Sequence, residues 1–254
     1  TLSLHDALPI SIQWAITGYS LALVAVIPLA GWMTDRFGTK RIFIIVISLF
    51  TLGSALCSMA RTPYELILFR VIQGIGGGMV MPIGMATIFR IAPKEKLGTF
   101  MGILGMPILL APTLGPVVSG YILQYFSWPL IFRINIPIGI IAIIVTILFL
   151  PEFERKEVPS LDIWGMILAP IAFAMLVYGV NEGSRSWSSI NTIVGLIVGG
   201  IALILFIYVE LSQKEPLIEL KVFGSKNFLS GIVVLSIFQI VLFSVMILDR
   251  KSVV

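Results

Sequence analysis

The sequence predicts an all-α polytopic membrane protein, a partial helix bundle with about eight transmembrane spans. Three observations support this prediction. Hydrophobic residues make up 58% of the 254-residue chain and charged residues only 12%, a balance far from that of soluble domains. Apolar runs of about 20 residues, the length that crosses a bilayer, alternate with short polar segments. Basic residues collect in alternate polar segments, as they do between membrane spans.

Hydropathy divides the chain into eight apolar runs. The expected spans cover residues 12–32, 42–60, 65–90, 98–123, 129–150, 161–181, 190–210 and 229–248. The longest linkers, over residues 151–160 and 211–228, are too short to form a soluble domain. The spans therefore account for most of the chain.

The charged segment Gly31–Arg41 joins the first two spans. Since a short loop brings its spans back antiparallel, we expect a tight turn here. Gly31 would permit close backbone approach, and Asp35 would lie near helix-end N–H groups. We expect the basic residues of the segment, which are Arg36, Lys40 and Arg41, to hold it in the cytoplasm.

Lysine and arginine are distributed unequally between the two sides of the expected bundle. The side of Gly31–Arg41 carries eleven, namely Arg36, Lys40, Arg41, Arg90, Lys94, Lys96, Arg155, Lys156, Lys214, Lys221 and Lys226; the other carries only Arg61 and Arg185. The basic side is therefore expected to be cytoplasmic, at the inner membrane. This orientation places Ser11 outside, and a missing span before it would restore a cytoplasmic N-terminus.

Both ends of the chain resemble foreign sequence. Thr1–Ile10 resembles the translation of a common sequencing adapter, and Asp249–Val254 resembles that of its reverse complement. We therefore take Ser11–Leu248 as the natural sequence and leave residues 1–10 and 249–254 out of functional reasoning.

Several classes of function lack the residues that they need. Cys57 is the lone cysteine and His5, in the foreign end, the lone histidine, so the sequence offers no disulfide, zinc ligand set or thiol nucleophile with its base. The net charge of +4 is spread over short loops rather than gathered into a stripe. We expect no enzyme, no cofactor, no metal site and no nucleic-acid partner.

Arg70 lies inside an apolar span, where a charged side chain costs about 2.5–3.5 kcal/mol. It should face the bundle interior or water, together with Gln73 and Gly74 at i+3 and i+4. Gly74 and Gly78 would let a neighbouring helix approach closely. Arg70 either tunes the protonation of a carboxylate on another helix or bonds backbone carbonyls in a structural role; we favour the first.

The span over residues 98–123 is rich in proline and glycine, including Pro112, Gly115, Pro116 and Gly120. Each interior proline removes a helical hydrogen bond, so this span should bend and expose carbonyls toward a cavity. The bend either gates the path between conformations or is a packing kink without a gating role.

These segments, in order, resemble motifs of the fourteen-helix drug:proton antiporter branch of the major facilitator superfamily. The loop between the second and third helices of that branch is matched by Gly31, Asp35, Arg36, Gly38 and Arg41. Its fourth-helix motif is matched by Arg70, Gln73, Gly74 and Gly78. Its fifth-helix antiporter motif is matched by Gly115, Pro116 and Gly120. Ala111 and Ser119 replace glycines that are frequent in that motif. The resemblance implies an N-terminal half over residues 11–150 that lacks its first helix, two extra central helices over 151–210, and the start of a C-terminal half over 211–248.

The resemblance implies a proton-coupled efflux transporter that moves small amphipathic or cationic molecules outward by alternating access. It implies that Asp35 and its neighbours form a latch that biases one conformation, and that the complete protein is monomeric. The proton-binding carboxylate would lie on the missing first helix, so the fragment alone should not transport. The alternatives are an exporter of a specific metabolite or siderophore and a non-transporting, truncated membrane protein.

Overall fold

The computed structural model describes residues 4–153, 163–184, 186–213 and 220–251, and those residues form helices and connecting turns without any strand. The α-helices are α1 (Leu4–Val26), α2 (Leu29–Phe37), α3 (Thr39–Met59), α4 (Pro63–Ile91), α5 (Leu97–Tyr125), α6 (Leu130–Arg133), α7 (Asn135–Phe149), α8 (Ile163–Gly183), α9 (Ile190–Ser212) and α10 (Lys226–Lys251). Two short 3₁₀ helices, η1 (Lys94–Lys96) and η2 (Leu220–Gly224), precede α5 and α10.

Five helical segments of the described chain are long and apolar enough to cross a membrane. They are Thr39–Met59, Pro63–Ile91, Leu130–Phe149, Trp164–Gly183 and Ile190–Ser212. The helices Gln13–Val26 and Leu29–Phe37, which meet at 54°, make a sixth if the bent pair is taken as one span. The all-α, multi-span architecture is thereby confirmed. The other two expected spans coincide with α5 and with α10, of which Lys226–Val241 counts as a shorter apolar helix.

The expected loop between the first two spans is wrong in extent. Gly31 lies inside α2, Thr39 already begins α3, and Gly38 alone separates the two helices. Gly38 adopts φ 93° and ψ 135°, a conformation that L side chains rarely adopt. The first span instead breaks earlier, at Pro28, because proline lacks the N–H that would continue the ladder of α1.

Residues before α4 fix its start. The Thr62 hydroxyl accepts the backbone N–H of Glu65 at 3.2 Å, and the Glu65 carboxylate accepts the backbone N–H of Arg61 at 2.7 Å. Pro63 occupies the first turn, where a missing N–H costs nothing. This cap satisfies donors that a helix start otherwise leaves unpaired.

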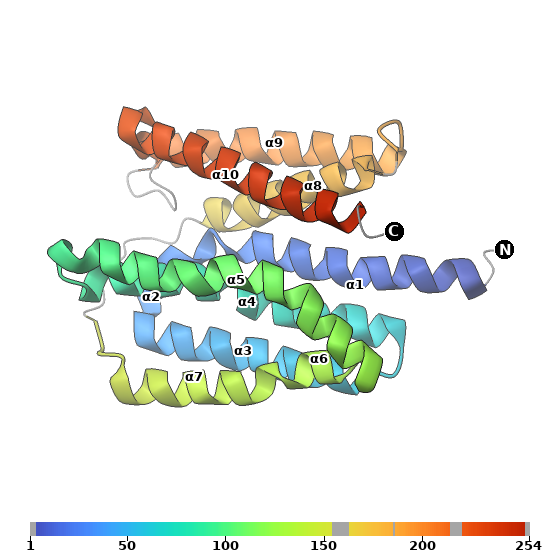
Figure 1. Ribbon diagram of the computed structural model, residues 1–254. Coiled ribbons are helices and arrows are strands. Elements are labelled where there is room, and N and C mark those ends of the chain that lie inside the picture. Colours follow the sequence, from blue (N-terminus) through green and yellow to red (C-terminus); the bar gives the residue numbers. More distant parts are fainter. Residues whose placement is uncertain (1–3, 154–162, 185, 214–219, 252–254) are drawn as a thin grey trace.

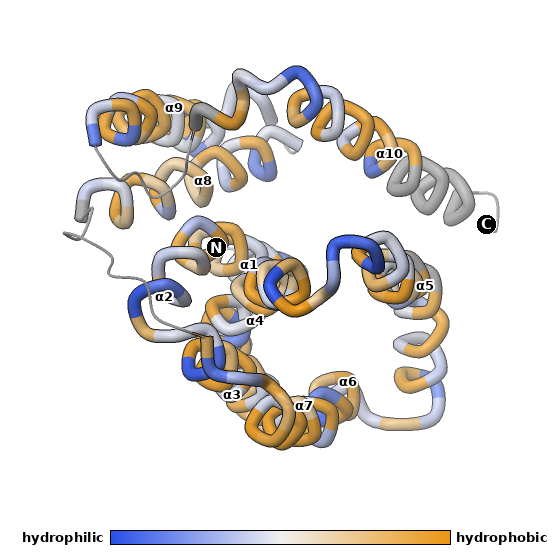
Figure 2. The backbone as a smooth tube through the Cα atoms, turned by 90° about the vertical axis from the view of Figure 1, so that its left-hand side faces the viewer, coloured by the Kyte–Doolittle hydropathy of each residue, from blue (hydrophilic) through white to orange (hydrophobic). Residues whose placement is uncertain are grey.

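The helices pack side by side in an order that differs from their order along the chain. From one edge to the other, α9 packs on α8, α8 on α1, α1 on α4, α4 on α3, and α3 on α7 (Figure 2). The long helices run along one common direction, so alternate connections lie at the same end of the molecule (Figure 1). The end of the molecule that contains Gly38 is where α2 and α4 end and where α3, η1, α5 and α10 begin (Figure 1). It therefore carries the basic residues Arg36, Lys40, Arg41, Arg90, Lys94, Lys96 and Lys226, whereas Arg61, between α3 and α4, lies at the opposite end.

Glycines allow α4 to pack tightly on two neighbours. A methyl group at Gly74 would lie 2.6 Å from the Tyr19 carbonyl oxygen, and one at Gly78 would collide with the Leu23 carbonyl oxygen, both on α1. On the other side, a methyl group at Gly76 would collide with the backbone of Phe50 on α3. The expected close approach at Gly74 and Gly78 therefore matches the packing.

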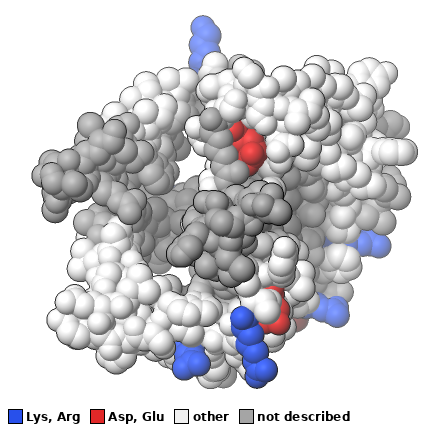
Figure 3. Space-filling view, turned by 90° about the vertical axis from the view of Figure 1, so that its right-hand side faces the viewer, with Lys and Arg blue, Asp and Glu red and all other residues white. Residues whose placement is uncertain are grey.

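Two helices stand apart from this packed row. α5 makes its main contacts with the flanking η1 and α6, and α10 with η2. In the end-on view both lie on one side of the row (Figure 2). The space-filling view shows openings through the molecule toward this side (Figure 3).

Candidate functional site

Arg70 belongs to a hydrogen-bonded network that connects three helices. Its Nη1 donates to Oε1 of Gln73 at 2.8 Å, and Nε2 of Gln73 donates to Oγ of Ser54 on α3 at 2.7 Å. Nδ2 of Asn135 on α7 reaches the same hydroxyl at 3.4 Å. Gln73 is 2% exposed and Ser54 0%. We call these four residues the Arg70 network; its inner members are shielded from solvent, where such bonds are strongest.

Aromatic rings rather than carboxylates surround the Arg70 guanidinium. Its central carbon lies 4.0 Å from the ring centroid of Tyr19 on α1 and 5.6 Å from that of Phe132 on α6. Both distances allow cation–π attraction. Among the described residues, no carboxylate lies at salt-bridge distance from the Arg70 guanidinium.

A cavity of about 530 Å³ lies beside the Arg70 network. Its wall combines α1, α3, α4 and α7, and its lining is mostly apolar, including Phe50 and Met81. Polar groups enter from Tyr19, Asn135 and Thr146. Asn135 belongs to the Arg70 network and Tyr19 stacks on its guanidinium, so the network and the cavity share part of one wall. The volume and lining are typical of small-molecule sites between helices.

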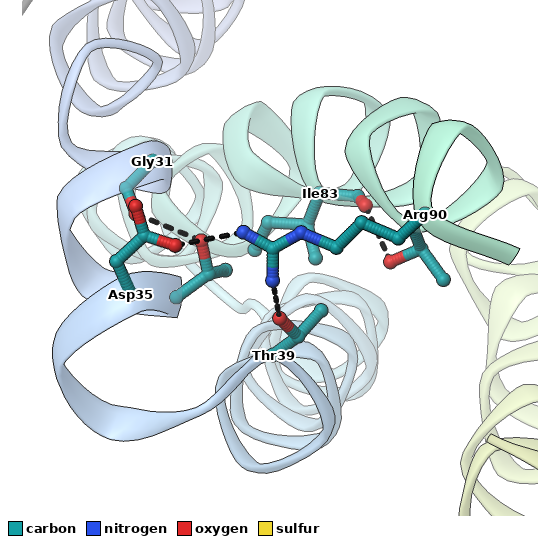
Figure 4. Close-up of polar contacts among 7 residues, drawn as sticks. Gly31, Asp35, Thr39, Ile83 and Arg90 are labelled. Carbon is teal, nitrogen blue, oxygen red and sulfur yellow. Dashed lines mark hydrogen bonds and ion pairs between the residues drawn. The ribbon is translucent and has the colours of Figure 1, made fainter. Parts of the chain in front are cut away.

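Asp35 forms a second network at the end of the molecule that contains Gly38 (Figure 4). Nη2 of Arg90, in the last turn of α4, lies 2.7 Å from Oδ1 of Asp35 on α2. Nη1 of Arg90 donates to Oγ1 of Thr39, the first residue of α3, at 2.9 Å. We call Asp35, Thr39 and Arg90 the Asp35 network. It holds the ends of α2, α3 and α4 together through one guanidinium.

The remaining residues of the Gly31–Arg41 segment have separate roles in the packing. Nζ of Lys40 donates to the Ile147 carbonyl oxygen in the last turn of α7, at 2.8 Å. The Gly31 carbonyl oxygen accepts the Thr34 hydroxyl at 2.8 Å (Figure 4). The expected close approach at Gly31 is wrong, since open space surrounds the position of its missing Cβ. Arg36 and Arg41 are exposed.

The proline-rich segment lies apart from both networks. Pro112, Gly115, Pro116 and Gly120 all fall within α5, a continuous helix whose ribbon changes direction along its length (Figure 1). Open space surrounds the Cβ positions of Gly115 and Gly120. The structure therefore brings no partner helix against the expected antiporter motif in this part of the chain.

Sequence reasoning missed the partners of both arginine networks. Arg90 was counted only among the basic loop residues. Its place in the last turn of a span, on the same side as the charged segment Gly31–Arg41, is a usable signal for the ion pair with Asp35. Ser54 and Asn135 are polar residues inside apolar spans, which by itself marks them as interior. Glu182, in the last turn of α8, is a further acidic residue that is nearly buried, at 8% exposure.

The geometry is that of a polytopic helix bundle, with polar networks inside glycine-packed helices and a cavity between them. The sequence model described as Major Facilitator Superfamily matches residues 4–252. The chain belongs to the major facilitator superfamily. This match reaches into both terminal segments that resemble adapter sequence, so their foreign origin stays a prediction.

Similar proteins carry transporter names. The chain is 35% identical over 239 residues to the "Uncharacterized MFS-type transporter YhcA" of Bacillus subtilis (strain 168), covering 94% of this chain and 45% of that protein. It is 36% identical over 225 residues to the "Putative multidrug resistance protein MdtD" of Serratia proteamaculans (strain 568), covering 88% and 47%. The protein of that name from Escherichia coli (strain K12) is 35% identical, with 88% and 48% covered. The chain thus spans about half the length of the curated relatives it matches.

Proposed function

We propose that this chain is part of a proton-coupled exporter that moves small amphipathic or cationic molecules out of the cell by alternating access. The observation that supports this most directly is the Arg70 network. A guanidinium within a membrane span, held over Tyr19 and bonded to a buried Gln73, is costly unless function retains it. The multidrug-resistance names of the relatives are consistent with this substrate class.

In this proposal Arg70 controls a carboxylate on a helix outside the described residues. A positive charge within about 4–6 Å favours the ionised form of a carboxyl group and so lowers its pKa. When the two groups move apart, the carboxyl group takes up a proton more readily. Arg70 would thereby couple proton binding to the position of its helix, with the neighbouring cavity of about 530 Å³ as a candidate substrate site.

The Asp35 network acts as the latch of this cycle. Alternating access requires helix ends to separate on one side of the membrane while they close on the other. The Arg90 guanidinium closes one such end by joining α2, α3 and α4. We place this end in the cytoplasm because the described basic residues gather there.

Proton coupling is tested with the full-length coding sequence in inverted membrane vesicles, using ethidium as a cationic probe. A ΔpH, acid inside, should drive ethidium uptake into the vesicles, and a protonophore should abolish it. Arg70→Ala should remove ΔpH-driven uptake. Arg70→Lys, which keeps the positive charge but loses the planar set of guanidinium N–H donors, should retain part of it. Uptake that is independent of ΔpH in the parent protein would overturn the proposal.

Orientation is tested separately in intact cells. In a Cys57→Ser background, a single cysteine at Lys94 should react with a membrane-impermeant maleimide only after the membrane is opened. A single cysteine at Ser186, at the other end of the bundle, should react in intact cells. The reverse pattern would place the Asp35 network outside and contradict its cytoplasmic assignment.

A further inference from the structure

A second cavity lies between α1 and α8, away from the Arg70 network. Its volume is about 460 Å³, and its walls come from Thr17 and Ser20 on α1 and from Leu176, Val180 and Asn181 on α8. This volume is within the range of small-molecule sites, which commonly form between packed helices.

One polar side chain in this cavity has bonding capacity that the described residues leave open. Nδ2 of Asn181 donates to Oγ1 of Thr17 at 2.9 Å, and Thr17 is 7% exposed. A carboxamide carries two N–H donors and an oxygen with two lone pairs. One N–H and the oxygen of Asn181 therefore have no partner among the described residues, and since the side chain is partly exposed, both stay open to a ligand in the cavity.

The charge and shape of the lining restrict what would fit. The cavity lining contains no ionisable side chain, so a charged molecule would lose its hydration without gaining a counter-charge. A pure hydrocarbon would leave the Asn181 amide unsatisfied. A neutral molecule with adjacent donor and acceptor groups would satisfy that amide and place its apolar body against Leu176 and Val180.

An aromatic pair lies one helical turn away from the polar residues of the cavity. The rings of Trp14 on α1 and Tyr178 on α8 stack with centroids 5.9 Å apart. Trp14 precedes Thr17 by three residues, and Tyr178 precedes Asn181 by three, so each ring lies on the same helix face as the polar residue. Flat apolar groups pack well on such rings.

We propose that the cavity between α1 and α8 is a binding site for neutral amphipathic small molecules that carry a carboxamide or equivalent donor–acceptor pair on an apolar body. The site is separate from the cavity beside Arg70 and does not depend on proton coupling. The Asn181 amide hydrogen-bonds to the polar group of the molecule, and its apolar part packs against Leu176 and Val180.

Tryptophan quenching tests the site directly. The 254-residue chain is placed in phosphatidylcholine nanodiscs with Trp14 as its one tryptophan, the other four being changed to Phe. The probe 4-bromobenzamide should quench Trp14 emission saturably, because bromine quenches on contact. Bromobenzene, which lacks the amide, should bind at least fivefold more weakly. Asn181→Leu should lower the affinity for 4-bromobenzamide to that of bromobenzene and leave bromobenzene unchanged.

Two matched variants separate occupancy of this cavity from a general effect. Ser20→Leu, which fills the cavity, should abolish saturable quenching, whereas Ala142→Leu, which fills the cavity beside Arg70, should not change it. Thr17→Val, isosteric and without the hydroxyl, provides a second polar variant if Asn181→Leu does not elute as a monodisperse species. Equal affinity for both probes, or quenching by dibrominated lipid chains with none by 4-bromobenzamide, would overturn the proposal.

Discussion

Arg90 and Asp35 lie 55 residues apart in the chain, yet their side chains meet at 2.7 Å. The same guanidinium donates to the Thr39 hydroxyl at 2.9 Å, so a single side chain of α4 connects the end of α2 with the start of α3. Both partners of the ion pair remain partly exposed, at 31% and 27% of their side chains. Such a pair is strong enough to order a helix end and weak enough to break during a conformational change.

We expect Asp35→Asn to weaken the connection between the ends of α2 and α4. The amide keeps the shape of the carboxylate but loses its charge, and an exposed ion pair contributes up to about 1 kcal/mol. Thermal unfolding in detergent should show a modest loss of stability of that order. In the full-length protein, double electron–electron resonance between spin labels at the ends of α2 and α4 should show a broader distance distribution.

The exchanged pair Asp35→Arg with Arg90→Asp is the control for this prediction. If the ion pair itself matters, the double variant should recover part of the narrow distance distribution that each single variant loses. Equal distance distributions in the parent protein and in Asp35→Asn would show that the pair does not hold the helix ends.

Gly38 is the one residue between α2 and α3, with φ 93°. Gly38→Ala should destabilise the chain by about 1–2 kcal/mol because a Cβ is disfavoured at positive φ. Gly31→Ala, seven residues earlier inside α2 with open space around its Cβ position, should change thermal stability by less than about 0.5 kcal/mol. Equal effects of the two substitutions in thermal unfolding would contradict the turn geometry.

The length of the apolar runs and the charge distribution were sufficient to predict the multi-span architecture, because span length and the grouping of basic residues depend on local sequence. Helix breaks were harder to predict. Polar residues at Thr34–Arg36 suggested a loop, but their backbone groups are satisfied within α2, and proline at position 28 breaks the span instead. Charge marks where a chain leaves the bilayer, whereas backbone hydrogen bonding decides where a helix ends.

The candidate site was predictable in part for the same reason. Arg70 and Gln73 share a helix face, so spacing alone brings them together. Ser54 and Asn135 come from α3 and α7, and the pattern within one span does not reveal which polar residue of another span it meets. The proline-rich α5 shows the converse case, since its motif was identifiable while its partner helix was not.

Glycine packing on α4 leads to a position-specific prediction. Gly78→Ala should destabilise the chain by about 1–3 kcal/mol, because the added methyl group would collide with the Leu23 carbonyl oxygen and force α1 away. Gly84→Ala on the same helix is the matched control, since open space surrounds its Cβ position. Thermal unfolding in one detergent should separate the two variants, and a Gly84→Ala variant as unstable as Gly78→Ala would contradict the packing of α1 on α4.

Gln73 is the side chain through which Arg70 reaches α3, and its replacement should therefore reveal what the network contributes. Gln73→Leu keeps the volume but removes the acceptor of Arg70 Nη1 and the donor to Ser54 Oγ. Loss of a buried partner of a charged group costs about 1–3 kcal/mol. Ser54→Ala, which removes the hydroxyl on α3 and leaves the bond between Arg70 and Gln73 intact, should cost about 1 kcal/mol. Thermal unfolding measures both, and a Ser54→Ala loss equal to or larger than that of Gln73→Leu would show that the bond to α3, rather than the one to Arg70, is the main stabilising contact.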